Sequence, residues 1–199
     1  MRTFRLLALA AVGSAAVFLF GCMSQQERSA LLNGPYTVQV DYAQSVEDLL
    51  KAGQYNWVHY LLSSANFPGT ESGAGTLSAV LVPFSPQADL GWFLGHTPAG
   101  MRPATLKELL AFGDTYREVQ RKLPVLALGT SARLEVPTYR VEHINDPTRL
   151  PLVIMTPKVE QVYPVLAGGL PGRTAAIEWL GDPGGYGMYY ALFVSSKQG

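Results

Sequence analysis

The sequence predicts an α+β protein: a single domain with an antiparallel sheet, a few short helices in the middle of the chain and a C-terminal β-hairpin. Three observations indicate this class. Residues 36–42 alternate as a half-buried strand does, residues 105–123 have capped, apolar spacing typical of helices, and two strand-like runs close the chain. Strands precede and follow the helices instead of alternating with them, which favours α+β over repeated βαβ units.

The domain is expected to begin with a strand and a short helix. Every second residue of Tyr36–Tyr42 is Tyr or Val, so one face of this strand is apolar. Ser45 suits a helix N-cap, and Gly53 stands where a C′ glycine ends a helix. The next run, residues 55–62, fits either a helix or a strand. A loop over residues 67–75 and a strand over 76–84 are predicted to follow.

The middle of the chain is predicted to be helical. A short helix is expected within residues 87–95. Thr105 and Glu108 have the spacing of a capping box, and Gly113 is expected to end the helix that they begin. A second helix is predicted over residues 114–123, since Pro124 stops it, and a short buried strand over residues 125–128 follows.

The last third of the chain is predicted to hold short strands and a hairpin. Prolines recur from residue 130 to 172, so strands there should be short or lie at sheet edges, with residues 152–155 as the best candidate. Residues 174–180 and 188–194 read as two strands. The glycine-rich residues between them suit a turn, which predicts that the two strands pair as a hairpin.

Residues 1–21 have the features of an export signal and are left out of the fold prediction. Arg2 and Arg5 supply a positive start without any acid, and residues 6–20 are almost entirely apolar. Fifteen residues form a helix of about 22 Å. A membrane-spanning helix needs about 20 residues to cross roughly 30 Å of hydrocarbon, so this segment suits the hydrophobic region of a signal peptide.

The end of this segment, Leu19-Phe20-Gly21-Cys22, resembles the lipobox of bacterial lipoprotein precursors. That resemblance implies signal cleavage after Leu19, Phe20 and Gly21, a diacylglycerol on the Cys22 thiol, and an acyl chain such as palmitate on the new amine. Cys22 is the sole cysteine of the chain, which leaves no partner for an intramolecular disulfide. An ordinary secretory signal and an uncleaved anchor are the alternatives.

The lipoprotein resemblance also implies a location and a domain plan. Two or three acyl chains anchor a protein stably, and Met23 in place of Asp points to the outer membrane over the inner one, with the domain facing the periplasm. Residues 22–35 are then a lipidated N-terminus and polar tether, which can reach at most about 40 Å. Residues 36–197 form the single domain.

Two phrases in the middle of the chain carry a second resemblance. Residues 101–113 (MRPATLKELLAFG) and 123–129 (LPVLALG) resemble a set of small uncharacterised bacterial proteins. The set also opens with a strand like residues 36–42 and ends with an aromatic strand. It has no assigned activity, so the resemblance implies one compact domain and no site residues.

Composition and motifs favour a function without catalysis. Without Arg2 and Arg5, the 15 basic side chains fall to 13 against 15 acidic ones, a net charge of −2 that does not suit nucleic-acid binding. His59, His96 and His143 are too far apart for a recognisable metal motif. The serine and glycine groups match neither a nucleophile elbow nor a phosphate loop. No metal or cofactor is therefore expected beyond the acyl groups on Cys22.

The sequence therefore predicts a membrane-anchored envelope lipoprotein that acts as a non-enzymatic binding or assembly module. Its partners would be the membrane, through the lipid, and an envelope protein or glycan. His96, Arg117, Arg121 and Lys122 are the candidate partner surface, because a basic helix face can meet an acidic partner or anionic headgroups. The alternative is a membrane-anchored hydrolase acting on envelope material, with a site that sequence spacing hides.

Overall fold

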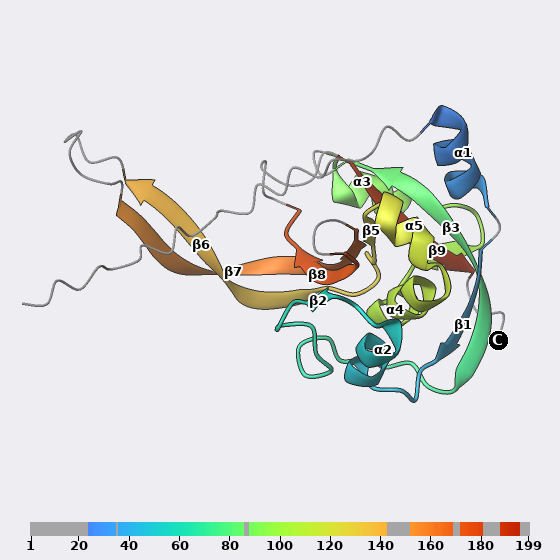
Figure 1. Cartoon of the computed structure of the whole chain (residues 1–199), viewed down its shortest axis with the longest axis horizontal. Helices are drawn as coiled ribbons and strands as arrows, with labels where there is room; N and C mark the ends of the chain where they lie inside the picture. Colours follow the sequence, from blue (N-terminus) through green and yellow to red (C-terminus); the bar gives the residue numbers. More distant parts are fainter. Residues whose placement is uncertain are drawn as a thin grey trace, which may run out of the picture.

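The computed structural model describes residues 24–34, 36–85, 88–142, 152–168, 172–180 and 188–195. Five helices and nine strands lie in these ranges, and the α+β prediction is confirmed (Figure 1). The helices are α1 (Gln25–Asn33), α2 (Val46–Gly53), α3 (Leu90–Gly95), α4 (Leu106–Thr115) and α5 (Arg117–Lys122). The strands are β1 (Tyr36–Asp41), β2 (Trp57–Val58), β3 (Ala74–Phe84), β4 (Met101–Pro103), β5 (Val125–Leu126), β6 (Ala132–Glu142), β7 (Leu152–Ala167), β8 (Thr174–Glu178) and β9 (Tyr189–Ser195).

The strands form one mostly antiparallel sheet in the order β1-β3-β9-β5-β7-β8-β2. β4 also pairs with β9, and β6 pairs with β7. Only two of the described pairings are parallel, β5 with β9 and β2 with β8. β1 lies at one end of this order, which leaves one of its edges without a strand partner among the described residues.

Strand β9 separates two apolar cores. Tyr190, Leu192 and Val194 belong to the larger core, which α2, α4 and α5 share with one face of the sheet. The alternate side chains of β9, among them Tyr189 and Phe193, belong to a smaller core beneath α3. Because successive side chains of a strand point to opposite faces, all residues from 189 to 194 are buried.

Burial on both faces of β9 explains why the two strands expected to pair as a C-terminal hairpin pair with other strands instead. Both strands are present at the predicted places, but β8 pairs with β7 and β2, whereas β9 pairs with β3, β4 and β5. A strand that is apolar on both faces is stabilised most in the centre of a sheet. The run Tyr189–Val194 has that character, so β9 lies between β3 and β5 and away from β8.

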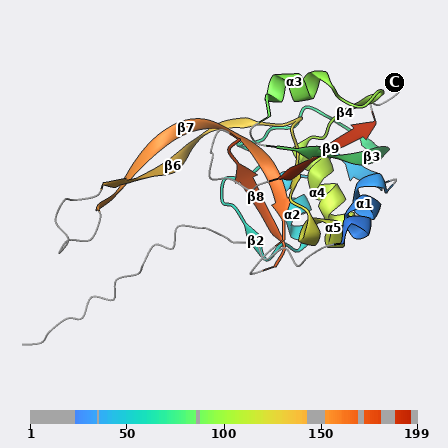
Figure 2. The same ribbon diagram turned by 90° about the horizontal axis from the view of Figure 1, so that it is seen from above.

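Strands β6 and β7 are longer than the short strands predicted between residues 130 and 172, but β6 has β7 as its one described strand partner and so fits the predicted alternative of an edge strand. They have 11 and 16 residues and form a two-stranded arm that projects from the body of the molecule (Figures 1 and 2). Pro137 lies directly opposite Pro157 in the register. Antiparallel ladders contain pairs that exchange no hydrogen bonds, and two opposed prolines fit such a pair because neither has an N–H.

Helix α4 starts as predicted and ends later than predicted. Thr105 and Glu108 occupy the capping-box positions, and the Thr105 N–H donates to Glu108 Oε2 at 2.8 Å, while the described structure gives the Thr105 hydroxyl no hydrogen bond. Gly113 does not end this helix, which continues to Thr115. A Cβ on Gly113 would lie 2.6 Å from the Tyr55 hydroxyl and 2.3 Å from a Leu166 methyl. The glycine therefore permits close packing rather than helix termination.

The segment expected to be a polar tether, residues 22–35, contains helix α1. Ser24 and Glu27 form a capping box at its start, and the Tyr36 hydroxyl donates to the Leu31 carbonyl at its end. Leu31 and Leu32 pack against the larger core. Nine helical residues span about 14 Å, so this part of the connection is shorter than an extended chain and is attached to the domain.

The residues that the lipobox resemblance concerns, Leu19, Phe20, Gly21 and Cys22, lie outside the described ranges, as do His143 and the whole of the predicted export signal, residues 1–21. Among the helices that the structure describes, none has the length and apolar character needed to cross a bilayer.

Arg173 is buried where helices α2 and α4 approach the sheet. Its guanidinium donates to the carbonyls of Gly53 and Gly113 and, at 3.0 Å, to Gln120 Oε1. It also lies 4.8 Å from the centre of the Tyr55 ring. Gly53 is the last residue of α2 and Gly113 lies in the last turn of α4, where the helix dipole favours a cation.

We expect Arg173→Ala to lower the free energy of unfolding by about 3 kcal/mol or more, because two buried carbonyls and one amide lose their donor. Urea unfolding followed by circular dichroism measures this loss. Arg133→Ala, which removes an exposed arginine on β6, is the matched control and should change the value by less than about 0.5 kcal/mol. Equal effects of the two substitutions would contradict the role assigned to Arg173.

Candidate functional site

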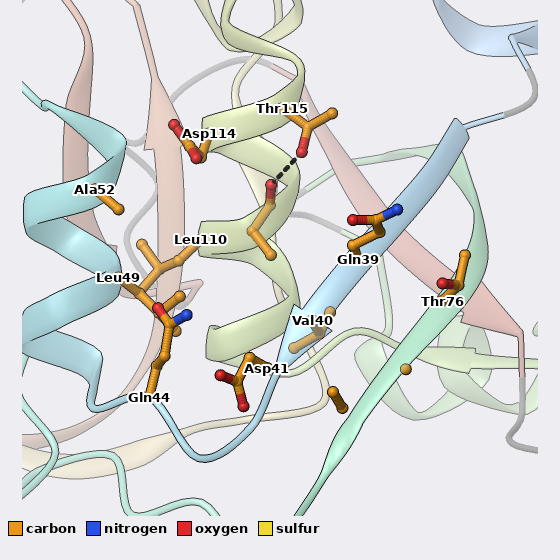
Figure 3. A pocket seen from close by; sticks show the side chains of 13 residues that line it. Gln39, Val40, Asp41, Gln44, Leu49, Ala52, Thr76, Leu110, Asp114 and Thr115 are labelled. Atoms are coloured by element: carbon orange, nitrogen blue, oxygen red, sulfur yellow. Dashed lines mark hydrogen bonds between the residues drawn. The ribbon is translucent and has the colours of Figure 1, made fainter.

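An open groove of about 740 Å³ lies between α2 and α4 on one side and β1 and β3 on the other (Figure 3). This volume lies in the range of small-molecule sites. Its lining residues are Gln39, Val40, Asp41, Gln44, Leu49, Ala52, Ala74, Gly75, Thr76, Leu110, Ala111, Asp114 and Thr115.

One wall of the groove is the unpaired edge of β1. Tyr42 N–H donates to Gly73 O at 2.8 Å, so the backbone groups of Tyr42 face β3. Successive residues of an antiparallel strand turn these groups to opposite sides. The backbone N–H and C=O groups of Thr37, Gln39 and Asp41 therefore face away from β3, toward the groove side of the strand.

A tyrosine hydroxyl occupies one end of this edge. Tyr116 Oη accepts a hydrogen bond from Thr37 N–H at 2.9 Å and donates to Thr37 O at 3.1 Å. Both outward groups of Thr37 are thus satisfied. In the described part of the chain, no hydrogen bond from another element reaches the outward groups of Gln39 or the N–H of Asp41, while Asp41 O accepts from Gln44 N at 3.3 Å.

The groove combines an apolar base with a polar rim. Val40, Leu49 and Leu110 are buried at its base, and Gln39 and Gln44 are exposed at its rim. Figure 3 shows the rim side chains on both sides of the hollow and the bond from the Thr115 hydroxyl to the Ala111 carbonyl, at 3.0 Å. An elongated ligand with apolar and polar positions suits this lining.

The charges in the groove are acidic. Asp114 is paired with Arg117 at 2.6 Å, whereas Asp41 Oδ1 accepts the Ala43 N–H at 3.0 Å. No described basic side chain lies within ion-pair distance of Asp41, and none is among the residues that line the hollow. Asp41 therefore leaves a carboxylate available to a cationic group.

A second, smaller hollow of about 460 Å³ lies beside a buried carboxylate. Arg102, which lines the hollow, donates to both oxygens of Glu108, and the Tyr42 hydroxyl and Thr105 N–H donate to the same carboxylate. Burial acts to raise the pKa of Glu108, but the bonds from Arg102, Tyr42 and Thr105 outweigh it and hold that pKa below its usual range. All donors face one acceptor, so this cluster stabilises the start of α4.

The described histidines lie in aromatic surroundings. His59 Nδ1 accepts the Leu61 N–H at 3.2 Å, and its ring stacks on the exposed Tyr60. Burial lowers the pKa of His59. His96 stacks on the exposed Trp92 and lies 2.7 Å from the Trp92 carbonyl. Within the described ranges neither histidine contacts a serine or carboxylate, and no group of three metal-ligating side chains is present.

The four residues of the predicted partner surface occupy two places. Arg117, Arg121 and Lys122 are on α5, and each faces an acid: Asp114 at 2.6 Å, Glu118 at 2.8 Å and Glu27 at 4.0 Å respectively. His96 is the C-cap residue of α3, and no described contact joins it to the three. Arg117 is the one that reaches the groove, through Asp114.

The groove itself was not among the sequence predictions. The alternation of Tyr36–Tyr42 correctly places Thr37, Gln39 and Asp41 on the exposed face of β1. It does not reveal that β1 ends the sheet, because that depends on pairing with β3 over a distance of more than thirty residues. Neither Tyr116 nor Arg173 has a local pattern that indicates its role.

Comparisons with known proteins find no family model, no curated protein and no solved structure that matches this chain.

Glu108 should make stability depend on pH. The pKa of Glu108 is lower in the folded than in the unfolded state. The ionised carboxylate therefore stabilises the fold fully at pH values above the unfolded pKa, and this stabilisation is lost as the pH falls through the folded pKa. We expect the unfolding free energies of wild type and Glu108→Gln to converge as pH falls from about 5 to about 3. Urea titrations at each pH measure this. Glu135→Gln, an exposed control on β6, should differ from wild type in unfolding free energy by a several-fold smaller amount. Equal changes for the two variants would refute the prediction.

Proposed function

We propose that this chain is a lipid-anchored envelope protein that acts as a non-enzymatic binding module, with the groove beside β1 as its ligand site. The lipid on Cys22 would hold it in the outer membrane, and the domain would face the periplasm. The observation that supports this most directly is the open backbone edge of β1, which faces a groove of about 740 Å³ lined by apolar and polar side chains.

The contact between α1 and the domain supports a short connection to the membrane. Since α1 begins three residues after Cys22 and packs on the core through Leu31 and Leu32, a lipid on Cys22 would keep the domain within a few turns of helix from the bilayer. A binding module in this position would meet partners that lie in or near the membrane.

The chemistry of the groove supports binding rather than hydrolysis. Its described lining offers carboxylates, amides and two threonine hydroxyls but neither histidine nor serine. The Thr115 hydroxyl donates to the Ala111 carbonyl, and Asp114 is already paired with Arg117. The hydrolase alternative would need a nucleophile next to a base. Among the described residues that line the groove, no contact supplies that pair. The serine–carboxylate contacts that the structure describes, such as Ser64 Oγ with Glu47 Oε2 at 2.6 Å, lie outside the groove lining.

Cys22→Ser tests the anchor. We expect the wild-type chain to incorporate a radiolabelled fatty acid and to sediment with outer membranes, because its thiol accepts diacylglycerol. The serine variant should show neither label nor cleavage at residue 21. Ser24→Ala, which alters the neighbouring helix cap and keeps the thiol, is the control and should retain the label. Label that persists in Cys22→Ser would overturn the proposed anchoring.

Photocrosslinking in intact cells tests the ligand site. A benzoylphenylalanine in place of Gln44 should give adducts with a partner, because Gln44 lies on the rim of the groove. The same probe in place of Trp92, an exposed residue on α3, is the position control. Adding Ala52→Trp to the Gln44 probe should remove the adducts by filling the groove. Equal adducts from both positions, or no adduct at Gln44, would contradict the proposal.

A further inference from the structure

We propose that the ligand of the groove is an extended peptide segment with a basic side chain, which binds by adding a strand to the edge of β1. This inference rests on the proposed function, since it names the class of ligand for the same groove. Strand addition uses main-chain hydrogen bonds for affinity and side-chain contacts for specificity.

The backbone of β1 provides the first argument. Gln39 presents both an N–H and a C=O on the unpaired edge, and Asp41 presents an N–H. These groups recur at every second residue, which is the spacing that an added strand meets. A single side chain or a compact small molecule would bond to the backbone groups of one of these two residues, whereas a peptide of three or four residues bonds to the backbone groups of both.

Tyr116 provides the second argument, because it shows that this edge accepts hydrogen-bonding partners in the geometry required. Its hydroxyl binds the outward N–H and C=O of Thr37 together. The open part of the edge begins at the next outward residue, Gln39, and continues to Asp41, and both residues line the groove (Figure 3). The Tyr116 hydroxyl therefore limits the added strand to the Gln39–Asp41 part of β1.

The side chains around the groove provide the third argument. The apolar base formed by Val40, Leu49 and Leu110 suits the inward side chains of an extended peptide. Asp41 has a carboxylate without a described cationic partner, so a Lys or Arg in the peptide would complement it. None of the described lining residues is aromatic, although stacking on aromatic rings is how proteins commonly hold the apolar faces of sugars. The lining thus favours a peptide over a glycan.

A displayed library of random octapeptides, selected against the full-length chain in detergent micelles, tests the inference. We expect enriched peptides to share β-branched residues at alternate positions and at least one Lys or Arg. An enriched peptide, synthesised with a fluorescent label, then gives Kd by anisotropy. A library without any enriched peptide would overturn the inference.

Two pairs of variants identify the binding mode. Gln39→Pro removes the outward N–H of residue 39 and leaves the hydrogen bonds between β1 and β3 intact, so Kd should rise at least fivefold. Gln39→Ala keeps this N–H and should change Kd less than twofold. Asp41→Asn should raise Kd about threefold for the basic peptide and should remove most of its salt dependence. Replacing the peptide's basic residue with Gln should abolish the effect of Asp41→Asn.

A change in the peptide alone guards against misfolding of the Gln39→Pro variant. N-methylation of alternate peptide residues blocks strand pairing on one edge without altering the protein. One of the two methylated registers should lose binding at least tenfold, and the other should keep it. Hydrogen exchange should also slow at the amides of Gln39 and Asp41 when the peptide binds, while the amide of Thr37, already bonded to Tyr116, should change little.

The outcomes separate this inference from the proposed function. If both methylated peptides bind like the parent while Ala52→Trp removes binding, the groove is a ligand site but strand addition is wrong. If Ala52→Trp also leaves Kd unchanged, peptides bind elsewhere and both proposals fail. Loss of binding in one methylated register, together with the Gln39→Pro and Ala52→Trp effects, supports both.

Discussion

The buried guanidinium of Arg173 holds together the part of the fold on which the groove depends. It binds the carbonyl at the end of α2 and a carbonyl in the last turn of α4, although these residues are 120 and 60 positions away in the chain. No described carboxylate bonds to it, so helix ends and the Tyr55 ring provide its electrostatic compensation. Since α2 and α4 form one side of the groove, the width of the groove depends on this cation.

Local signals in the sequence predicted local structure well. The alternation of residues 36–42, the N-cap at Ser45 and the capping-box positions of Thr105 and Glu108 all involve neighbours within four residues, and each feature is present. Long-range constraints were not predictable in this way. Gly113 resembles a helix terminator in sequence, yet contacts from Tyr55 and Leu166 require a small residue inside the helix. The pairing of β9 between β3 and β5 follows from burial on two faces, which a turn-like connection to β8 concealed.

The candidate site, too, was predictable from the sequence only where it depends on a local pattern. The exposed positions of β1 could be predicted from their period of two, but the sequence predicted the binding surface on α5, where charge is conspicuous. Arg117, Arg121 and Lys122 each have an acidic neighbour in the structure. A backbone edge has no residue signature, because its donors and acceptors belong to every amino acid except proline. Only the order of strands in the sheet reveals it.

The bond between Tyr116 and Thr37 has a consequence for how copies of this protein behave when they are crowded on one surface. A long unpaired strand invites the same strand of a neighbour, and such pairing spreads from molecule to molecule. The hydroxyl occupies the outward groups of Thr37 and leaves a short open stretch with an acidic residue at its end. Two copies that approach edge to edge would bring their Asp41 carboxylates into the same small region. The edge can therefore admit a short foreign strand while it resists polymerisation of the sheet.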